Sequence, residues 1–401
     1  MHFIIGFLFI FSTPLWAKTY SITGNEKTKT HYIERLLFKC EEEQTTLKKL
    51  EQCLLNSRLF SEVNIKEVDQ KIIVDVKDRW SIIPFPSIKL KSDGKKSYGF
   101  FIFDGNFLGM GTLFGVGGSY SNTSSSYVLF YQDKSFLLTN WTMGFSTGRN
   151  NADIYLKTKA LKVKDAFHEK TSHTTFSLGY SFSNQLNIEG SLMERFSTYE
   201  IIDNYTLLQE FRSTIAKIKA TWKNEEYKFY FSDGIRLTSS FDKEIYRTDE
   251  SSKTRSFNFN FIAGKETFNK QAIQWTINTT VVNANDKRDS LKSSSGKQSS
   301  ARGLRGIPEG SYLASSLFTT SFDYQIPLRF TKYGTWTFAP FFDFGKINIF
   351  EHKTVDLWQK AYGLGSYFFL KGIMLPGIGF IVGRNETFNT GFAELSIGES
   401  F

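Results

Sequence analysis

From residue 82 to the end of the chain, apolar and polar residues alternate, and this alternation constrains the fold more than any other feature. The alternating segments are 9 to 14 residues long, as in "TTFSLGYSFS" and "AIQWTINTTVV", and Gly, Asn, Asp and Ser turns separate them. Successive side chains of a strand point to opposite faces of a sheet. Residues 82–401 therefore predict an antiparallel β structure with one apolar and one polar face.

Two architectures fit such a sheet, a soluble sandwich and a transmembrane barrel. A sandwich packs one strand face into a core and exposes the other to water. In this chain, which holds 41 Phe and 18 Tyr, the apolar face is instead rich in aromatic residues, and the opposite face carries mainly Thr, Ser, Gly, Asn and Lys. Such a polar face suits a wet lumen. In "WTFAPFFDFG" one face carries Trp336, Phe338, Phe342 and Phe344, and the other carries Thr335, Thr337, Ala339, Phe341, Asp343 and Gly345.

The segment lengths match the about 9–11 residues of a tilted transmembrane strand. At about 20 residues for a strand and its connection, residues 82–401 provide about 16 strands, an even number that suits a closed barrel. Closure also satisfies every backbone polar group in lipid, which an open sheet cannot do. We predict a mainly β fold, with a transmembrane antiparallel β-barrel over residues 82–401.

Residues 18–79 have a different period. "THYIERLLFKC" and "TLKKLEQCLLNSRLF" place apolar residues at helical spacing, with a short strand before them and two strands after. This order predicts a small α+β domain ahead of the barrel. Residues 1–17 contain an apolar run too short to span a bilayer comfortably, and Ala17 precedes Lys18. They predict a secretory signal peptide that is cleaved after Ala17.

The only two cysteines, Cys40 and Cys53, lie on the apolar sides of the two predicted helices. In an oxidising compartment a disulfide between them would stabilise the small domain by roughly 3 kcal/mol. The alternative is a pair of buried free thiols, because a bridge needs Cα atoms within about 7 Å of each other. With two cysteines and no histidine cluster, we expect no metal site.

The formal charge of +9 comes from Lys and Arg spread along the whole chain. No basic helix or nucleic-acid motif concentrates them, so we expect solvated loops and contacts with acidic lipid headgroups rather than nucleic-acid binding. The histidines, at positions 2, 31, 168, 173 and 352, have no nucleophile–base pattern around them. We place "HEKTSH" (168–173) in a solvated hairpin loop and predict no enzyme activity and no cofactor.

Two arginines, Arg302 and Arg305, lie in the glycine-rich segment 301–312, "ARGLRGIPEGSY", and the question is why so flexible a segment carries them. A solvated loop is the simplest explanation. The alternation, however, turns Asp323 and Asp343 toward the lumen, where an arginine on an inward-folded loop could meet both carboxylates. Arginine suits such a tether because its planar fork binds carboxylates bidentately and stays charged.

Several motifs, in order along the chain, resemble those of the BamA/TamA superfamily (the bacterial surface antigen family). The 18–79 region resembles a polypeptide-transport-associated (POTRA) domain, without the glycine usual near Cys40. "DGNFLGMG" is similar to the family's first hairpin. "GFAELSIGESF" resembles its closing strand and carries a terminal signal for barrel insertion. In that signal Leu395 and Ile397 alternate before the final Phe401.

The resemblance implies that the sixth extracellular loop folds into the lumen, with a Val-Arg-Gly-Phe/Tyr tip docked on a Phe-x-Asp-x-Gly wall motif. Here these appear as "LRGI" (304–307) and "FFDFG" (341–345), and Asp323 stands where a Glu is usual. The replaced Val and aromatic leave the charge pairing intact. The implied tether comprises Arg305, Gly306, Asp323, Phe341, Asp343 and Gly345.

The family further implies an outer-membrane location, with the small domain in the periplasm. It implies a function in inserting outer-membrane proteins or translocating a client, with unfolded client polypeptides and the lipid bilayer as partners. A two-partner-type secretion channel is the alternative, because one POTRA-like domain is fewer than the general insertion factors carry. A passive porin-like barrel fits less well, since it needs neither the small domain nor the loop. The sequence does not identify accessory proteins.

Overall fold

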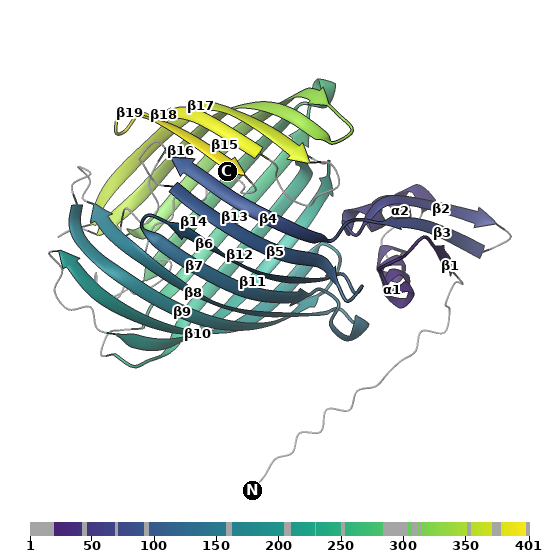
Figure 1. Ribbon diagram of the computed structural model, residues 1–401, viewed down its shortest axis with the longest axis horizontal. Coiled ribbons are helices and arrows are strands. Elements are labelled where there is room, and N and C mark those ends of the chain that lie inside the picture. Colours follow the sequence, from purple (N-terminus) through teal and green to yellow (C-terminus); the bar gives the residue numbers. More distant parts are fainter. Residues whose placement is uncertain are drawn as a thin grey trace, which may run out of the picture. The chain divides into compact units, whose positions relative to one another are not determined.

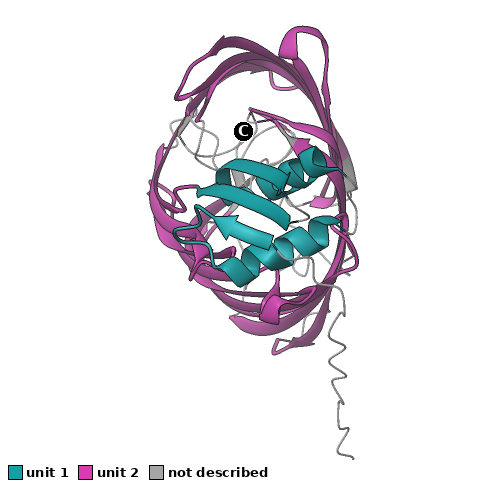
Figure 2. Ribbon diagram, turned by 90° about the vertical axis from the view of Figure 1, so that its right-hand side faces the viewer, with its two compact units in different colours: residues 1–78 teal, residues 79–401 magenta. Residues whose placement is uncertain are grey.

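The computed structural model divides the chain into two compact units, residues 1–78 and 79–401, coloured separately in Figure 2. The predicted signal peptide (residues 1–17) and Phe401 lie outside the residues that the structure describes. The described residues are 20–41, 46–68, 71–91, 96–157, 163–203, 210–228, 230–249, 253–283, 304–306, 312, 314–350, 354–370 and 378–397.

The first unit contains a sheet of three strands among its described residues, in the order β1-β3-β2. β1 is parallel and β2 antiparallel to the central β3. Strand β3 alternates Ile72, Val74 and Val76, which are buried, and the helices bury Ile33, Leu37, Leu50 and Leu54. None of the described helices is long and apolar enough to cross a membrane. The elements are β1 (Tyr20–Thr23), α1 (Thr30–Glu41), α2 (Leu47–Asn56), β2 (Phe60–Val68) and β3 (Lys71–Asp78).

The second unit is a closed barrel, and sixteen strands form it within the described residues, as the segment lengths predict (Figure 1). Every neighbouring pair is antiparallel. The strands are β4 (Ile82–Lys91), β5 (Lys96–Phe107), β6 (Thr112–Ser121), β7 (Ser124–Asp133), β8 (Trp141–Lys157), β9 (Val163–Ser181), β10 (Leu186–Asp203), β11 (Phe211–Tyr227), β12 (Ser232–Arg247), β13 (Arg255–Glu266), β14 (Ala272–Asn283), β15 (Ala314–Phe330), β16 (Gly334–Phe350), β17 (Thr354–Leu370), β18 (Ile378–Asn385) and β19 (Thr390–Ile397). Short 3₁₀ turns η1 (Phe136–Leu138) and η2 (Phe268–Lys270) join β7 to β8 and β13 to β14.

The two faces of the barrel wall follow the alternation of the sequence. On β16, Trp336 and Phe342 are exposed on the outside, whereas Thr337, Phe341 and Asp343 are buried on the inside. Large exposed apolar side chains recur on the outer faces of the other strands, as a lipid-facing surface requires. The mainly β prediction and the transmembrane barrel are confirmed.

One assignment from the sequence is wrong. Residues 168–173, expected in a hairpin loop, lie inside the long strand β9, where His173 pairs with Gly148 of β8 and with Arg195 of β10. The outward side chains of this segment are polar, which made the strand look like a loop in the sequence. A strand that continues beyond the lipid has no need of an apolar outer face.

Candidate functional site

The long connection between β14 and β15 places Leu304, Arg305 and Gly306 against the inner wall formed by β15 and β16. The Arg305 guanidinium donates from Nη2 to Asp343 Oδ1 (2.5 Å) and from Nε to Asp343 Oδ2 (2.8 Å). Its Nη1 donates to Asp323 Oδ1 (2.7 Å), and its backbone N–H donates to Asp343 Oδ2 (3.0 Å). The structure thus brings together the three charged residues that the sequence suggested as a tether.

Burial makes this cluster energetically important. The side chain of Asp343 has no exposed surface, and those of Arg305 and Asp323 are 13% and 20% exposed. A buried charge that loses its partner is strongly destabilised, because it cannot regain its hydration. The cluster therefore fixes the position of the arginine as long as all three charges are present.

Ser321 completes the cluster and was missed by the sequence reasoning. It is the cross-strand neighbour of Asp343. Its Oγ accepts from Arg305 Nη2 (2.7 Å) and donates to Asp343 Oδ1 (2.6 Å), so it links the two charges. The available signal was its position two residues before Asp323, which puts both side chains on the same face of β15.

An aromatic ring supports the arginine from the wall. The guanidinium carbon of Arg305 lies 3.6 Å from the centroid of the Phe341 ring, within the range of a cation–π contact. Phe341 is the cross-strand neighbour of Asp323 and lies two residues before Asp343, on the same face. The Phe-x-Asp spacing therefore supplies both the ring and the anion from one strand.

Steric contacts explain why glycine occupies two positions of the predicted tether. Gly306 has a φ of +82°, and a Cβ there would lie 2.5 Å from the ring of Phe392 on β19. A Cβ on Gly345 would lie 2.9 Å from both Leu304 methyl carbons and from the carbonyl oxygen of Phe318. Both positions exclude larger residues, because the loop lies directly on the wall.

Apolar packing holds the loop beside the charged cluster. Leu304 and Tyr312, on either side of the arginine in the chain, are almost fully buried. They share a cluster with residues of three barrel strands, which are Ala314, Ile347, Ile349 and Leu357. The local pattern did not single out Tyr312, because it does not show which residues beside the arginine pack against the barrel wall.

Comparison with known proteins decides the family. Residues 106–396, well over half of the chain, match the Omp85 superfamily domain. The chain belongs to the Omp85 superfamily. A comparison of the sequence with curated proteins finds no match.

Solved structures resemble this Omp85 chain over most of its length. BamA from Haemophilus ducreyi lacking POTRA domains 1–3 aligns with a TM-score of 0.60 and 14% identity, covering 95% of this chain and 84% of that one. CdiB from Acinetobacter baumannii gives 0.62 and 14%, over 95% and 73%. CdiB from Escherichia coli gives 0.64 and 11%, over 95% and 76%. At these identities the similarity shows the fold alone.

The barrel of this Omp85 chain closes where its last strand meets its first. The described pairing joins Ile88–Lys91 of β4 to Glu394–Ile397 of β19, and Leu395 lies opposite Leu90. An ion pair between Lys89 Nζ and Glu394 Oε1 (3.1 Å) crosses the same junction. Leu395 and Ile397 of the predicted terminal signal thus belong to the strand that closes the barrel.

The cysteines of this Omp85 chain form a bridge between helices α1 and α2. The Cys40 and Cys53 sulfurs are 2.01 Å apart, and the Cα atoms are 6.0 Å apart. Among the described residues, no group of His, Cys, Asp and Glu side chains is arranged to hold a metal ion. The disulfide therefore joins the two helices of the small unit.

Proposed function

We propose that this chain works in the outer membrane, either inserting barrel proteins or translocating a client polypeptide. The observation that carries the proposal is the Arg305 tether in the lumen of an Omp85 barrel. A passive pore needs no charged loop docked on its inner wall. The tether instead gives the barrel an internal element whose position depends on a few specific contacts.

The tether also reaches the last strand. Gly306 lies against Phe392 of β19, and the Phe392 ring is 6.3 Å from that of Phe341 on β16. β19 pairs with β18 along one edge and with β4 along the other. We propose that the docked loop supports β19 while the β4–β19 junction opens for the client.

The small unit offers an edge for the client. In the order β1-β3-β2, strand β2 pairs with β3 on one side and with no other described strand on its other side. An extended peptide can bind such an edge as an added strand. We propose that the unit acts as a periplasmic POTRA-like domain, that residues 1–17 direct export, and that the bridge between Cys40 and Cys53 strengthens this domain in an oxidising compartment.

Comparison of strains tests the function. A strain without the gene, complemented with the wild-type chain or with Arg305→Ala, is analysed for its outer-membrane and secreted proteins. Loss of barrel proteins from the membrane supports insertion. A single secreted protein retained in the periplasm supports the two-partner-type channel. If both protein sets stay unchanged while uptake of small solutes falls, the barrel is a passive pore and the proposal is wrong.

A further inference from the structure

Five neighbouring strands of the barrel, β8 to β12, are much longer than a membrane requires. They contain 16 to 19 residues each, whereas a tilted strand crosses the hydrocarbon layer in about 9–11 residues. The wall formed by these strands therefore continues past the lipid, and its outer face must pass through the headgroup layer.

Successive cross-strand rows on the outer face show where this passage occurs. One row is apolar, with Phe145 opposite Phe176 and Phe176 opposite Leu192. The next row toward the loops places Thr147 opposite Thr174 and Thr174 opposite Glu194. The row after that contains Tyr127, Arg149, Ser172, Phe196 and Arg212, each opposite the next.

We name the last of these rows the arginine row; it consists of Tyr127, Arg149, Ser172, Phe196 and Arg212. It combines aromatic side chains, which prefer the membrane interface, with cations that attract anionic headgroups. The row lies near the start of β7, and strand directions alternate from Ile82, where the barrel follows the small unit. It therefore belongs to the end of the barrel opposite Ile82. If the small unit is periplasmic, as proposed above, the arginine row faces the outer leaflet.

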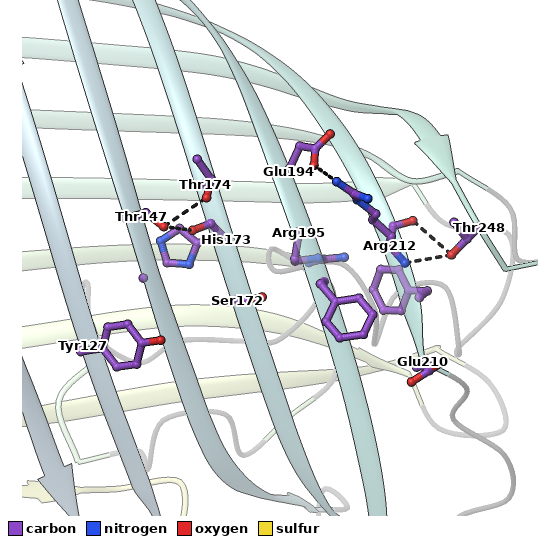
Figure 3. Close-up of a pocket in the computed structure, with 13 residues that line it drawn as sticks. Tyr127, Thr147, Ser172, His173, Thr174, Glu194, Arg195, Glu210, Arg212 and Thr248 are labelled. Atoms are coloured by element: carbon purple, nitrogen blue, oxygen red, sulfur yellow. Dashed lines mark hydrogen bonds and ion pairs between the residues drawn. The ribbon is translucent and has the colours of Figure 1, made fainter.

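A groove of about 500 Å³ lies at this row (Figure 3). The side chains of Tyr127, Ser172, Phe196 and Arg212 line it together with the Thr147 and Thr174 hydroxyls of the row below. The backbone at Gly148 contributes to its floor. The groove thus offers aromatic surfaces, hydroxyl groups and a guanidinium directly beyond the apolar band.

Two exposed guanidinium groups lie at the arginine row: Arg212 lines the groove, and Arg149 is the cross-strand neighbour of Tyr127 and Ser172, which line it. Arg212 Nη2 donates to Glu194 Oε2 (2.5 Å), and this pair is largely exposed, so the other guanidinium N–H groups are accessible. Arg149 Nε donates to Asn151 Oδ1 (3.3 Å), and no carboxylate in the described part of the chain forms an ion pair with it. Glu210 and Arg195 line the groove as well, and the buried Arg195 guanidinium is bound to Glu244. Glu194 occupies only one N–H direction of Arg212, and Arg149, beside the groove, has no ion pair among the described residues, so a phosphate can bind between the two guanidinium groups.

We propose that this groove binds the phosphorylated headgroup of an outer-leaflet lipid. Arg212 and Arg149 would hold the phosphate through charge-assisted hydrogen bonds, and the hydroxyls of Ser172, Thr147 and Thr174 would contact the rest of the headgroup. The acyl chains would continue over the apolar row of Phe145, Phe176 and Leu192. The proposal rests on the proposed outer-membrane location but not on the client or its transport.

Lipid binding by the purified full-length chain in detergent tests the proposal. The probe is bisphosphorylated lipid A, and binding is measured by native mass spectrometry and by titration. The Arg149→Gln/Arg212→Gln variant should bind lipid A at least about tenfold more weakly, as expected from the loss of charge-assisted hydrogen bonds. Lys228→Gln is the matched control, because Lys228 forms a similar exposed ion pair with Glu226 (2.9 Å) at the other end of β11. It should bind like the wild type.

Two further probes separate the sources of the phosphate. Dephosphorylated lipid A should bind weakly to every variant, and glucose 1-phosphate should not displace the lipid at equal concentration. Equal binding of the phosphorylated and dephosphorylated lipids, or wild-type affinity in the double variant, overturns the proposal. Full displacement by glucose 1-phosphate shows a site for a soluble phosphate instead. A shift in gel mobility between unboiled and boiled samples verifies that each variant forms a closed barrel. Because client transport is not measured, a failure of the proposed function would not affect this test.

Discussion

Arg305 and Asp343 are joined by three hydrogen bonds, from Nη2 and Nε of the guanidinium and from the backbone N–H of the same residue. Because the backbone takes part, Asp343 fixes the loop itself and not only the arginine side chain. A second carboxylate, from Asp323, binds the adjacent edge of the guanidinium, through Nη1 (2.7 Å) and Nη2 (3.4 Å). The arginine is therefore held by two strands at once.

Removing either partner of this pair should release the loop. We expect Arg305→Ala and Asp343→Ala each to cost about 2–5 kcal/mol of loop docking, because each leaves a buried charge without its partner. The double variant should be no worse than either single variant, since both remove the same interaction. Arg305→Lys should restore only part of the effect, because lysine lacks the bidentate fork. Protease sensitivity of the loop is the measurement, and Arg302→Ala, which removes the other arginine of the segment 301–312, is the control. Additive effects in the double variant would show that the two residues do not act together.

Ser321 should have a smaller effect than the charges. Replacing it with alanine removes one hydroxyl that links Arg305 to Asp343, while the direct contacts remain. We expect a loss of about 1 kcal/mol of loop docking, in line with a single hydrogen bond. Ser315→Ala is the matched control on the same strand, remote from the charged cluster. The same protease assay measures both, and equal effects of the two substitutions would exclude a specific role for Ser321.

The alternation of the sequence predicted the barrel and the inward position of Asp343 because side-chain direction in a strand is a local property. The docking of the arginine was suggested by the same alternation together with the family resemblance. Other features depend on contacts that are distant in the sequence. Phe392 meets Gly306 only because the barrel closes, and the residues around His173 were taken for a loop because polar outward positions beyond the membrane carry no strand-specific pattern. The hydrogen bond from the Ile65 N–H of β2 to Glu51 Oε1 of α2 depends on how a helix packs against a strand, which periodicity does not predict.

The disulfide should stabilise the small unit and not the barrel. We expect Cys40→Ala/Cys53→Ala to lower its free energy of unfolding by about 3 kcal/mol, because the bridge restricts the unfolded chain. Hydrogen exchange of residues 20–78 in the full-length chain measures this, with the barrel residues as an internal control. Mass spectrometry of the exported protein without reductant should find no alkylatable thiol. Two free thiols in that sample contradict the bridge.

A covalent link across the junction between β4 and β19 should block function while leaving the barrel intact. Leu90 and Leu395 are direct cross-strand neighbours, so Leu90→Cys/Leu395→Cys should form a disulfide on oxidation. Leu364→Cys/Val382→Cys places the same link between β17 and β18. We expect loss of complementation only for the first pair, with recovery after reduction. If both linked barrels complement the deletion strain equally, the junction does not need to open.

The free edge of β2 is partly occupied by a helix side chain. The Ile65 N–H donates to Glu51 Oε1 of α2 (2.8 Å), so an incoming strand must displace this carboxylate to pair there. We therefore expect Glu51→Ala to bind an extended peptide several-fold more tightly than the wild type, because the competitor is gone and an exposed edge donor is released. The probe is a synthetic peptide of residues 390–401, titrated against the full-length chain in detergent. Gln52→Ala, the next residue on the same helix, is the matched control. An unchanged affinity in Glu51→Ala, with peptide still bound at β2 by cross-linking, would show that the carboxylate does not compete with the client strand.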